Sequence, residues 1–174
     1  INNLRRLGQR REQVRGETGR IERRLGEVFA GHGFNVLVAH ALPVSPDVSA
    51  QIEEIDLLCA RDGYLLVLEV KSTYVRRSMK DAWLHRTTTL RKAGRQLQRK
   101  VAAVHQRLSS DAELNRALGL PGDAQPLVVG WIVDTSIECD RESFDGFLKL
   151  PLEEILVALR DDRHLLHGLS GLLQ

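Results

Sequence analysis

Two acidic residues and a lysine lie close together on a predicted β-hairpin, and their types suit phosphate chemistry. Two apolar, strand-like runs flank Asp62-Gly63, a dipeptide that favours a two-residue turn. Counting outward from this turn places Asp56 directly opposite Glu69, with Lys71 on the same face as Glu69. Like charges that face each other destabilise a hairpin. The pattern therefore indicates that something cationic belongs between the two carboxylates.

Carboxylate oxygens are hard ligands that suit Mg²⁺ or Mn²⁺. Mg²⁺ typically takes one or two protein carboxylates together with substrate phosphate, so Asp56 and Glu69 could provide the protein ligands of such a site. An ordinary hairpin whose charges face water is the alternative. In that case Lys71 pairs with Glu54, which also falls opposite it, or diagonally with Asp56. Such surface pairs contribute little to stability.

A third acid, Glu22, favours the metal site over the surface ion pair. It precedes Leu25 by three residues and Phe29 by seven, so it shares their apolar face on a predicted helix. A glutamate beside an apolar stripe needs a partner or a route to water. We interpret it as the rim of the metal site. The alternative is a boundary residue that reaches solvent or an arginine.

Positive charge is concentrated directly after the hairpin. The chain as a whole carries +2, but residues 71–107 hold eleven Lys or Arg and one Asp. Such a block suits a polyanion, and its position beside the carboxylates favours nucleic acid over a merely solvated helix face. Tyr74 and Trp83 could stack on bases, but for Trp83 we expect a role in packing, in the core or against a lid. The predicted phosphate contacts are Arg76, Arg77, Lys80, Arg91, Lys92, Arg95, Arg99 and Lys100.

The elements that must position these residues follow from periodicity and turn signals. A basic helix or arm is expected over residues 1–16, before a single domain over 17–174. A polar loop is expected over 72–86. The order α-β-β-β-α-β, with a long crossover helix, predicts an α/β domain: a mixed sheet flanked by helices, with a C-terminal helical extension. The expected core elements are a helix over 18–30 capped by Thr18, strands over 34–42, 54–60 and 64–71, a helix over 90–108 capped by Thr89, and a strand over 126–133. Shorter elements are expected over 111–118, 147–150 and 151–159.

Composition sets the broad class. The 174 residues are 43% apolar and 28% charged, as in a globular domain that needs no membrane. Cys59 and Cys139 are far apart and indicate reduced thiols in a cytoplasmic protein. Because the chain begins at Ile1, we expect a longer parent chain with further domains.

The quoted residues resemble a known superfamily. Asp56, followed after twelve residues by Glu69-Val70-Lys71, resembles the core motif of the PD-(D/E)xK nucleases. The segment IERRLGEVFAGHGFNVLV, which contains Glu22, resembles the first helix and strand of that superfamily. Holliday-junction resolvases and Mrr-like or NERD-type domains are the nearest members. The resemblance covers about residues 17 to 133, and Ile55 departs from it where the family has proline.

The resemblance implies a restriction-endonuclease-like fold and a metal-dependent nuclease. Mg²⁺ or Mn²⁺ would be held by Asp56, Glu69 and the carbonyl of Val70. Lys71 would orient or deprotonate the attacking water, or stabilise the developing charge. Glu22 would hold a water molecule or a second ion.

A helix glutamine that some members carry is matched to Gln96, with Gln98 as the alternative. The expected substrate is DNA, including branched or single-stranded DNA, and a symmetric cut would need a homodimer. The competing functions are a non-catalytic nucleic-acid-binding module with the same fold, and a protein-interaction domain whose basic face binds an acidic partner.

Overall fold

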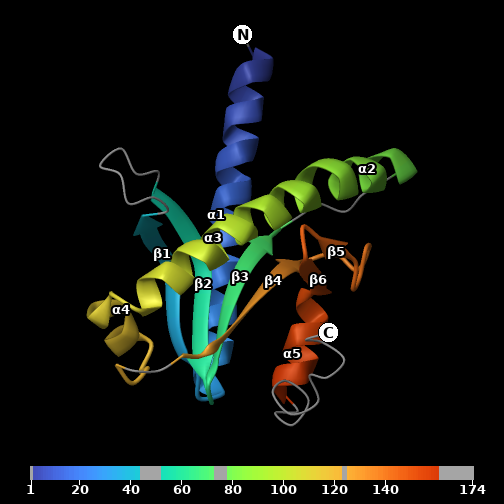
Figure 1. Cartoon of the computed structure of the whole chain (residues 1–174). Helices are drawn as coiled ribbons and strands as arrows, with labels where there is room; N and C mark the ends of the chain where they lie inside the picture. The colour runs from blue at the N-terminus through green and yellow to red at the C-terminus, as the bar shows by residue number, and fades with distance from the viewer. Residues whose placement is uncertain (1, 44–51, 73–77, 123–124, 161–174) are drawn as a thin grey trace.

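The computed structural model describes residues 2–43, 52–72, 78–122 and 125–160, which form an α/β domain around a mixed sheet (Figure 1). The order across the sheet is β1-β2-β3-β4-β6-β5. Neighbouring strands are antiparallel from β1 to β3, parallel from β3 through β4 to β6, and antiparallel between β6 and β5. The strands are β1 (Asn35–Pro43), β2 (Ile52–Arg61), β3 (Tyr64–Lys71), β4 (Leu127–Asp134), β5 (Ser143–Phe144) and β6 (Phe147–Pro151). The predicted fold class is confirmed.

The hairpin between β2 and β3 has the predicted register. Asp62 and Gly63 both have positive φ, 49° and 81°, as a type I′ turn requires. Arg61 pairs with Tyr64 across the turn, and the antiparallel ladder continues outward from that pair. The local turn chemistry therefore fixes which side chains of the two strands face each other.

The first helix is longer than predicted. One helix, α1 (Asn2–Gly31), replaces the expected basic arm and separate helix, so Thr18 lies inside a helix and caps nothing. The residues before Thr18 are mostly Arg, Gln, Glu and Leu, which favour helix, and the helix continues through Gly8 and Gly16. Gly33 follows with φ of 81° and turns the chain into β1. The predicted domain boundary at residue 16 falls within this helix.

The second helical segment also begins earlier than predicted. The expected loop over 72–86 is wrong from residue 78 onward, and Thr89 caps nothing. The side chain of Ser78 accepts a hydrogen bond from the Asp81 backbone N–H at 3.2 Å, which starts α2 (Met79–Leu84). This Ser-x-x-Asp spacing is a known helix-start signature. A π-helical segment, η1 (His85–Leu90), then leads directly into α3 (Arg91–Leu108).

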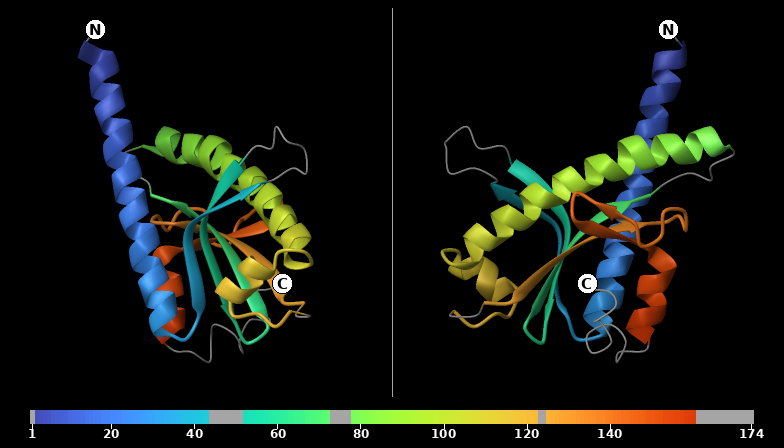
Figure 2. Two further views of the ribbon diagram at one scale, coloured as in Figure 1. Left: turned by 90° about the vertical axis from the view of Figure 1, so that its left-hand side faces the viewer. Right: turned by 45° about the vertical axis from the view of Figure 1, so that its right-hand side comes forward.

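Helices cover both faces of the sheet (Figure 2). On one face, α1 and α5 (Leu152–Arg160) pack on alternate residues of the central strands, with Phe29 and Trp131 in this core. On the other face lie the rod formed by α2, η1 and α3, and also α4 (Ala112–Ala117). Leu97 and Ile132 belong to this second core. Each central strand is therefore buried on both faces.

The predicted crossover is confirmed, because α3 connects β3 to the parallel strand β4. The predicted short elements correspond to α4, β6 and α5, whereas the two-residue strand β5 was not predicted. Cys59 and Cys139 are both free thiols. Among the residues described, no helix is long and apolar enough to cross a lipid bilayer.

Helix α3 approaches the sheet edge closely at Gly94. A Cβ atom there would lie 2.6 Å from the backbone oxygen of Phe144. We predict that Gly94→Ala lowers the free energy of unfolding by about 1–3 kcal/mol, because backbone atoms cannot yield as a flexible side chain can. Urea denaturation measures this.

The matched control is Gly19→Ala in α1, where an added Cβ atom would have no neighbour within 4 Å. This change should be neutral or stabilise the protein by up to about 1 kcal/mol, because alanine favours helix over glycine. Equal effects of the two substitutions would show that the approach at Gly94 is not a tight one.

Candidate active site

The strands β2 and β3 part where the two predicted acids lie. The antiparallel pairing extends to Leu57 opposite Leu68, which makes Asp56 and Glu69 the next residues outward. There the backbone N–H of Val70 donates to the Asp56 carboxylate Oδ2 at 2.6 Å. The Asp56 side chain thus accepts the bond that a backbone carbonyl of β2 would otherwise accept, and it enters the gap between the strands.

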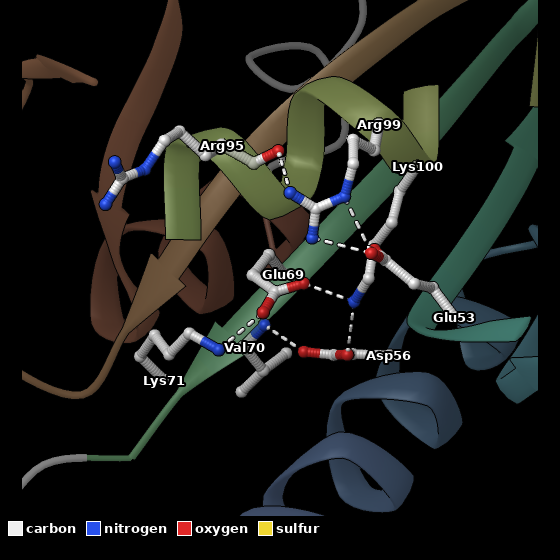
Figure 3. A network of polar contacts seen from close by, with 8 residues as sticks. All are labelled: Glu53, Asp56, Glu69, Val70, Lys71, Arg95, Arg99 and Lys100. Atoms are coloured by element: carbon white, nitrogen blue, oxygen red, sulfur yellow. Dashed lines mark hydrogen bonds and ion pairs between the residues drawn. The ribbon is translucent and has the colours of Figure 1, made fainter. Parts of the chain in front are cut away.

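Lys100 from α3 fills the space between the two acids. Its Nζ donates to Asp56 Oδ1 at 3.0 Å and also to Glu69 Oε2 (Figure 3). Lys100 is 3% exposed, Asp56 9% and Glu69 1%. The cation that the facing carboxylates required is therefore supplied by the protein itself, from the crossover helix α3.

Lys71 pairs with the other oxygen of Glu69, so the predicted common face of these two residues is present. The ion-pair partner of Lys71 is therefore Glu69 and not Glu54. The Lys71 side chain is 23% exposed, whereas that of Glu69 is 2% exposed. Lys71 therefore connects the buried acid to the solvent.

Glu22 approaches the same acids from α1. Its half-buried carboxyl has a pKa raised from 4.5 to about 7, first by burial and then by the charges of Asp56 and Glu54. The structure thus brings Glu22 to the rim of the acid pair, and it is partly protonated at neutral pH.

The charges inside the site are strongly coupled. Burial, and then the charge of Glu69, raise the pKa of Asp56, while Lys100, Lys71 and the Val70 N–H oppose that rise. Burial disfavours the charged form of Lys100, but Glu69 and Asp56 together outweigh burial and raise its pKa. The two acids and two lysines therefore form an electrically neutral set, in which each charge is stabilised by an opposite one.

The donor atoms fit a hard divalent ion in kind. In a strand, the N–H and C=O of one residue point to the same neighbour. The Val70 carbonyl therefore faces β2 and Asp56, while the carbonyl of Lys71 accepts from Thr135 on the β4 side. No three His, Cys, Asp or Glu side chains are grouped for a metal within the described residues. The ammonium of Lys100 holds the place between the carboxylates that an ion would need.

Most of the predicted phosphate contacts lie on the exposed side of the rod formed by α2, η1 and α3. Arg99 is also exposed and pairs with Glu53 on β2 at 2.6 Å. Lys100 departs from the prediction, because it is buried in the acid pair and does not line that surface. Arg76 and Arg77, with Tyr74, lie outside the described residues. The other exposed members of the set are Lys80, Arg91, Lys92 and Arg95.

Gln96 and Trp83 lie on the same rod. Gln96 is half-buried and one helical turn before Lys100, so it is on the site-facing side of α3, whereas Gln98 is exposed. Trp83 is 61% exposed, so the expected role in core packing is wrong. Its indole is therefore free to contact a ligand.

A polar cluster beside Lys71 was not predicted. Asp134 is the last residue of β4 and the register partner of Lys71. It is fully buried, and its carboxylate contacts His85 at 2.7 Å and the Ser136 hydroxyl at 2.6 Å. The sequence signal was available, because polar residues at the carboxyl ends of adjacent parallel strands meet at one sheet edge. The contact between His85 and Asp134 joins the start of η1 to the end of β4.

A mixed α/β sheet, with acids and lysines converging where two strands part, is consistent with a nuclease-like core. The family model described as nuclease-related domain, NERD, matches residues 15–131. The chain belongs to this family. The matched residues run from within α1 into β4 and include every member of the acid and lysine cluster. No curated protein matches the chain.

The raised pKa of Glu22 predicts a stability that depends on pH. Between about pH 4.5 and 7 the folded state keeps a proton that the unfolded state has lost, so the free energy of unfolding falls as pH rises through this window. We predict that Glu22→Gln reduces this fall and is more stable than wild type at pH 8, by roughly 1 kcal/mol after allowance for partial exposure.

Urea denaturation at pH 5 and pH 8, in buffer containing EDTA, measures the difference. Glu17→Gln is the control, because Glu17 is exposed on the same helix. If wild type and Glu22→Gln lose the same stability between the two pH values, the carboxyl of Glu22 does not experience the acid pair.

Proposed function

We propose that this NERD domain is a metal-dependent nuclease of the PD-(D/E)xK type that hydrolyses phosphodiester bonds, chiefly in DNA. The observation that carries the proposal is the convergence of Asp56, Glu69 and Lys71 at one gap in the sheet, with Glu22 at its rim. These four positions are the ones at which the sequence resembles the superfamily. Membership of a nuclease-related family supports the same reaction class.

Asp56, Glu69 and the Val70 carbonyl would hold Mg²⁺ or Mn²⁺. Bound there, the ion would polarise the phosphate and acidify water. Glu22, with a pKa of about 7, suits the acceptance of a proton from the attacking water at neutral pH. Lys71 reaches solvent from its contact with Glu69, so its ammonium can stabilise negative charge that develops on the phosphate.

The substrate would approach along the rod formed by α2, η1 and α3. The exposed side chains of Arg91, Lys92 and Arg95 follow one another on the helix that also carries Lys100 into the site. Contacts to phosphate position a nucleic acid without reading its sequence. Trp83 at the outer end of this rod suits stacking on an unpaired base.

For the reaction itself, we predict that wild-type protein with Mg²⁺ or Mn²⁺ cleaves DNA, and that Asp56→Asn and Lys71→Ala each reduce the rate by about 100-fold or more. The first change weakens ion binding, and the second removes a charge that stabilises the transition state. Rates on linear, single-stranded and branched DNA, and on RNA, measure the activity and its preference.

Glu113→Gln, an exposed change on α4, is the control and should leave the rate unchanged. Melting temperatures of all variants exclude unfolding as the cause of a loss. Cleavage that persists equally in Asp56→Asn and Lys71→Ala would come from a contaminant and would refute the proposal.

A non-catalytic nucleic-acid-binding module is the second candidate, and one observation favours it. Lys100 neutralises the acid pair without any added ion, as a domain that has lost its metal would require. Such a module would bind DNA in the presence of EDTA, and binding would survive Asp56→Asn. Absence of cleavage together with such binding would select this candidate.

Both candidates predict phosphate binding along α3. Simultaneous change of Arg91, Lys92 and Arg95 to alanine should weaken DNA binding and reduce the slope of log K against log salt by about 2–3, because each phosphate contact contributes nearly one unit. Fluorescence anisotropy at several salt concentrations measures this.

The matched control changes three arginines of α1 to alanine, on the other face of the sheet. An equal loss of slope in that variant would show that phosphate binding is not specific to α3. The three control residues are Arg20, Arg23 and Arg24, all of them exposed.

A further inference from the structure

Lys100 places a positive charge inside the candidate active site. Its ammonium contacts both carboxylates of the pair, and the residue is 3% exposed (Figure 3). Lysine is rarely buried to this extent unless it is paired, because taking its charge out of water is costly. The position of Lys100 is therefore determined by the two acids.

The oxygens of both carboxylates are already engaged. Asp56 accepts from Lys100 on one oxygen and from the Val70 N–H on the other. Glu69 pairs with Lys100 on one oxygen and with Lys71 on the other. A divalent ion placed between these two acids would contact the same two oxygens that Lys100 contacts.

Charge balance leads to the same conclusion. Asp56 and Glu69 carry two negative charges, and Lys71 and Lys100 carry two positive charges, so the set is neutral. Adding a divalent ion beside Lys100 would leave two uncompensated charges at a buried site, with two cations a few ångströms apart. The ammonium and the ion are competitors for one position.

We propose that Lys100 is an internal counter-ion that alternates with the divalent ion at Asp56 and Glu69. Without the ion it neutralises the acids and ties α3 to the sheet. When the ion binds, the ammonium leaves on its flexible four-carbon stem, which needs no movement of the helix backbone. This inference rests on the proposed function and adds to it the residue that sets how much free ion the site requires.

The test is ion binding by the full chain in the absence of DNA. Wild type and Lys100→Met are freed of metal with EDTA, dialysed, and titrated with Mn²⁺ while thermal unfolding is followed. Lys100→Met should melt at a lower temperature than wild type without ion, because it leaves two facing acids unpaired. Its Mn²⁺ midpoint should be about tenfold lower or more, since a competing charged hydrogen bond has been removed.

Arg99→Met is the matched control. It removes one positive charge from the adjacent position of α3, where Arg99 is half-exposed and pairs with Glu53, and should leave the Mn²⁺ midpoint within about twofold of wild type. Lys100→Arg keeps the charge and should also stay closer to wild type than Lys100→Met does. If Lys100→Met folds only when Mn²⁺ is added, the ion has replaced the ammonium and the inference holds.

A Mn²⁺ midpoint in Lys100→Met that equals or exceeds that of wild type overturns the inference, as does the absence of a Mn²⁺ effect in every variant. Cleavage of DNA by wild type in the same buffers is scored separately. Cleavage without tighter ion binding in Lys100→Met rejects only the role of Lys100. Absence of cleavage rejects the proposed nuclease activity.

Discussion

Two carboxylates that share a buried gap cannot both stay ionised unless positive charge is brought to them. Asp56 and Glu69 are in this situation, and burial together with their mutual repulsion raises the pKa of Asp56. Lys100 and Lys71 supply the compensating charges from two different elements. Removing either lysine would therefore disturb more than a local contact, because the acids would be left without compensation.

The fold creates this situation by separating two strands that are paired elsewhere. Tight pairing near the Asp62-Gly63 turn gives way at Asp56, whose carboxylate takes the backbone N–H of Val70 as its donor. The resulting gap is reached by α1 on one face and α3 on the other. This explains how Glu22 and Lys100, which lie on opposite faces of the sheet, both respond to the same acids.

Features set by neighbouring residues were predictable from the sequence, whereas those set by distant contacts were not. The hairpin register followed from two turn residues whose backbone needs positive φ. The early start of α2 was also predictable from a local pattern, the spacing of Ser78 and Asp81. We predicted a loop instead because the segment is polar and basic. Lys100 was wrongly predicted to be a surface phosphate contact, because its charge was given more weight than its position along α3.

The position of Lys100 did carry a signal. It falls three residues after Leu97 and four before Val104, in line with the apolar stripe that packs α3 on the sheet. A charged residue in such a stripe needs a buried partner. Which partner it has depends on the crossover that brings α3 back over β3, and no local pattern in the sequence specifies that contact.

The helical rod from Met79 to Leu108 has a mechanical consequence. Trp83, near its outer end, and Lys100, near the acids, are about 25 Å apart along one axis at 1.5 Å per residue. Between them lies η1, a π-helical stretch whose first residue, His85, contacts the buried carboxylate of Asp134. The rod is therefore anchored to the sheet between Trp83 and Lys100, and its inner end carries the charge on which the acid pair depends.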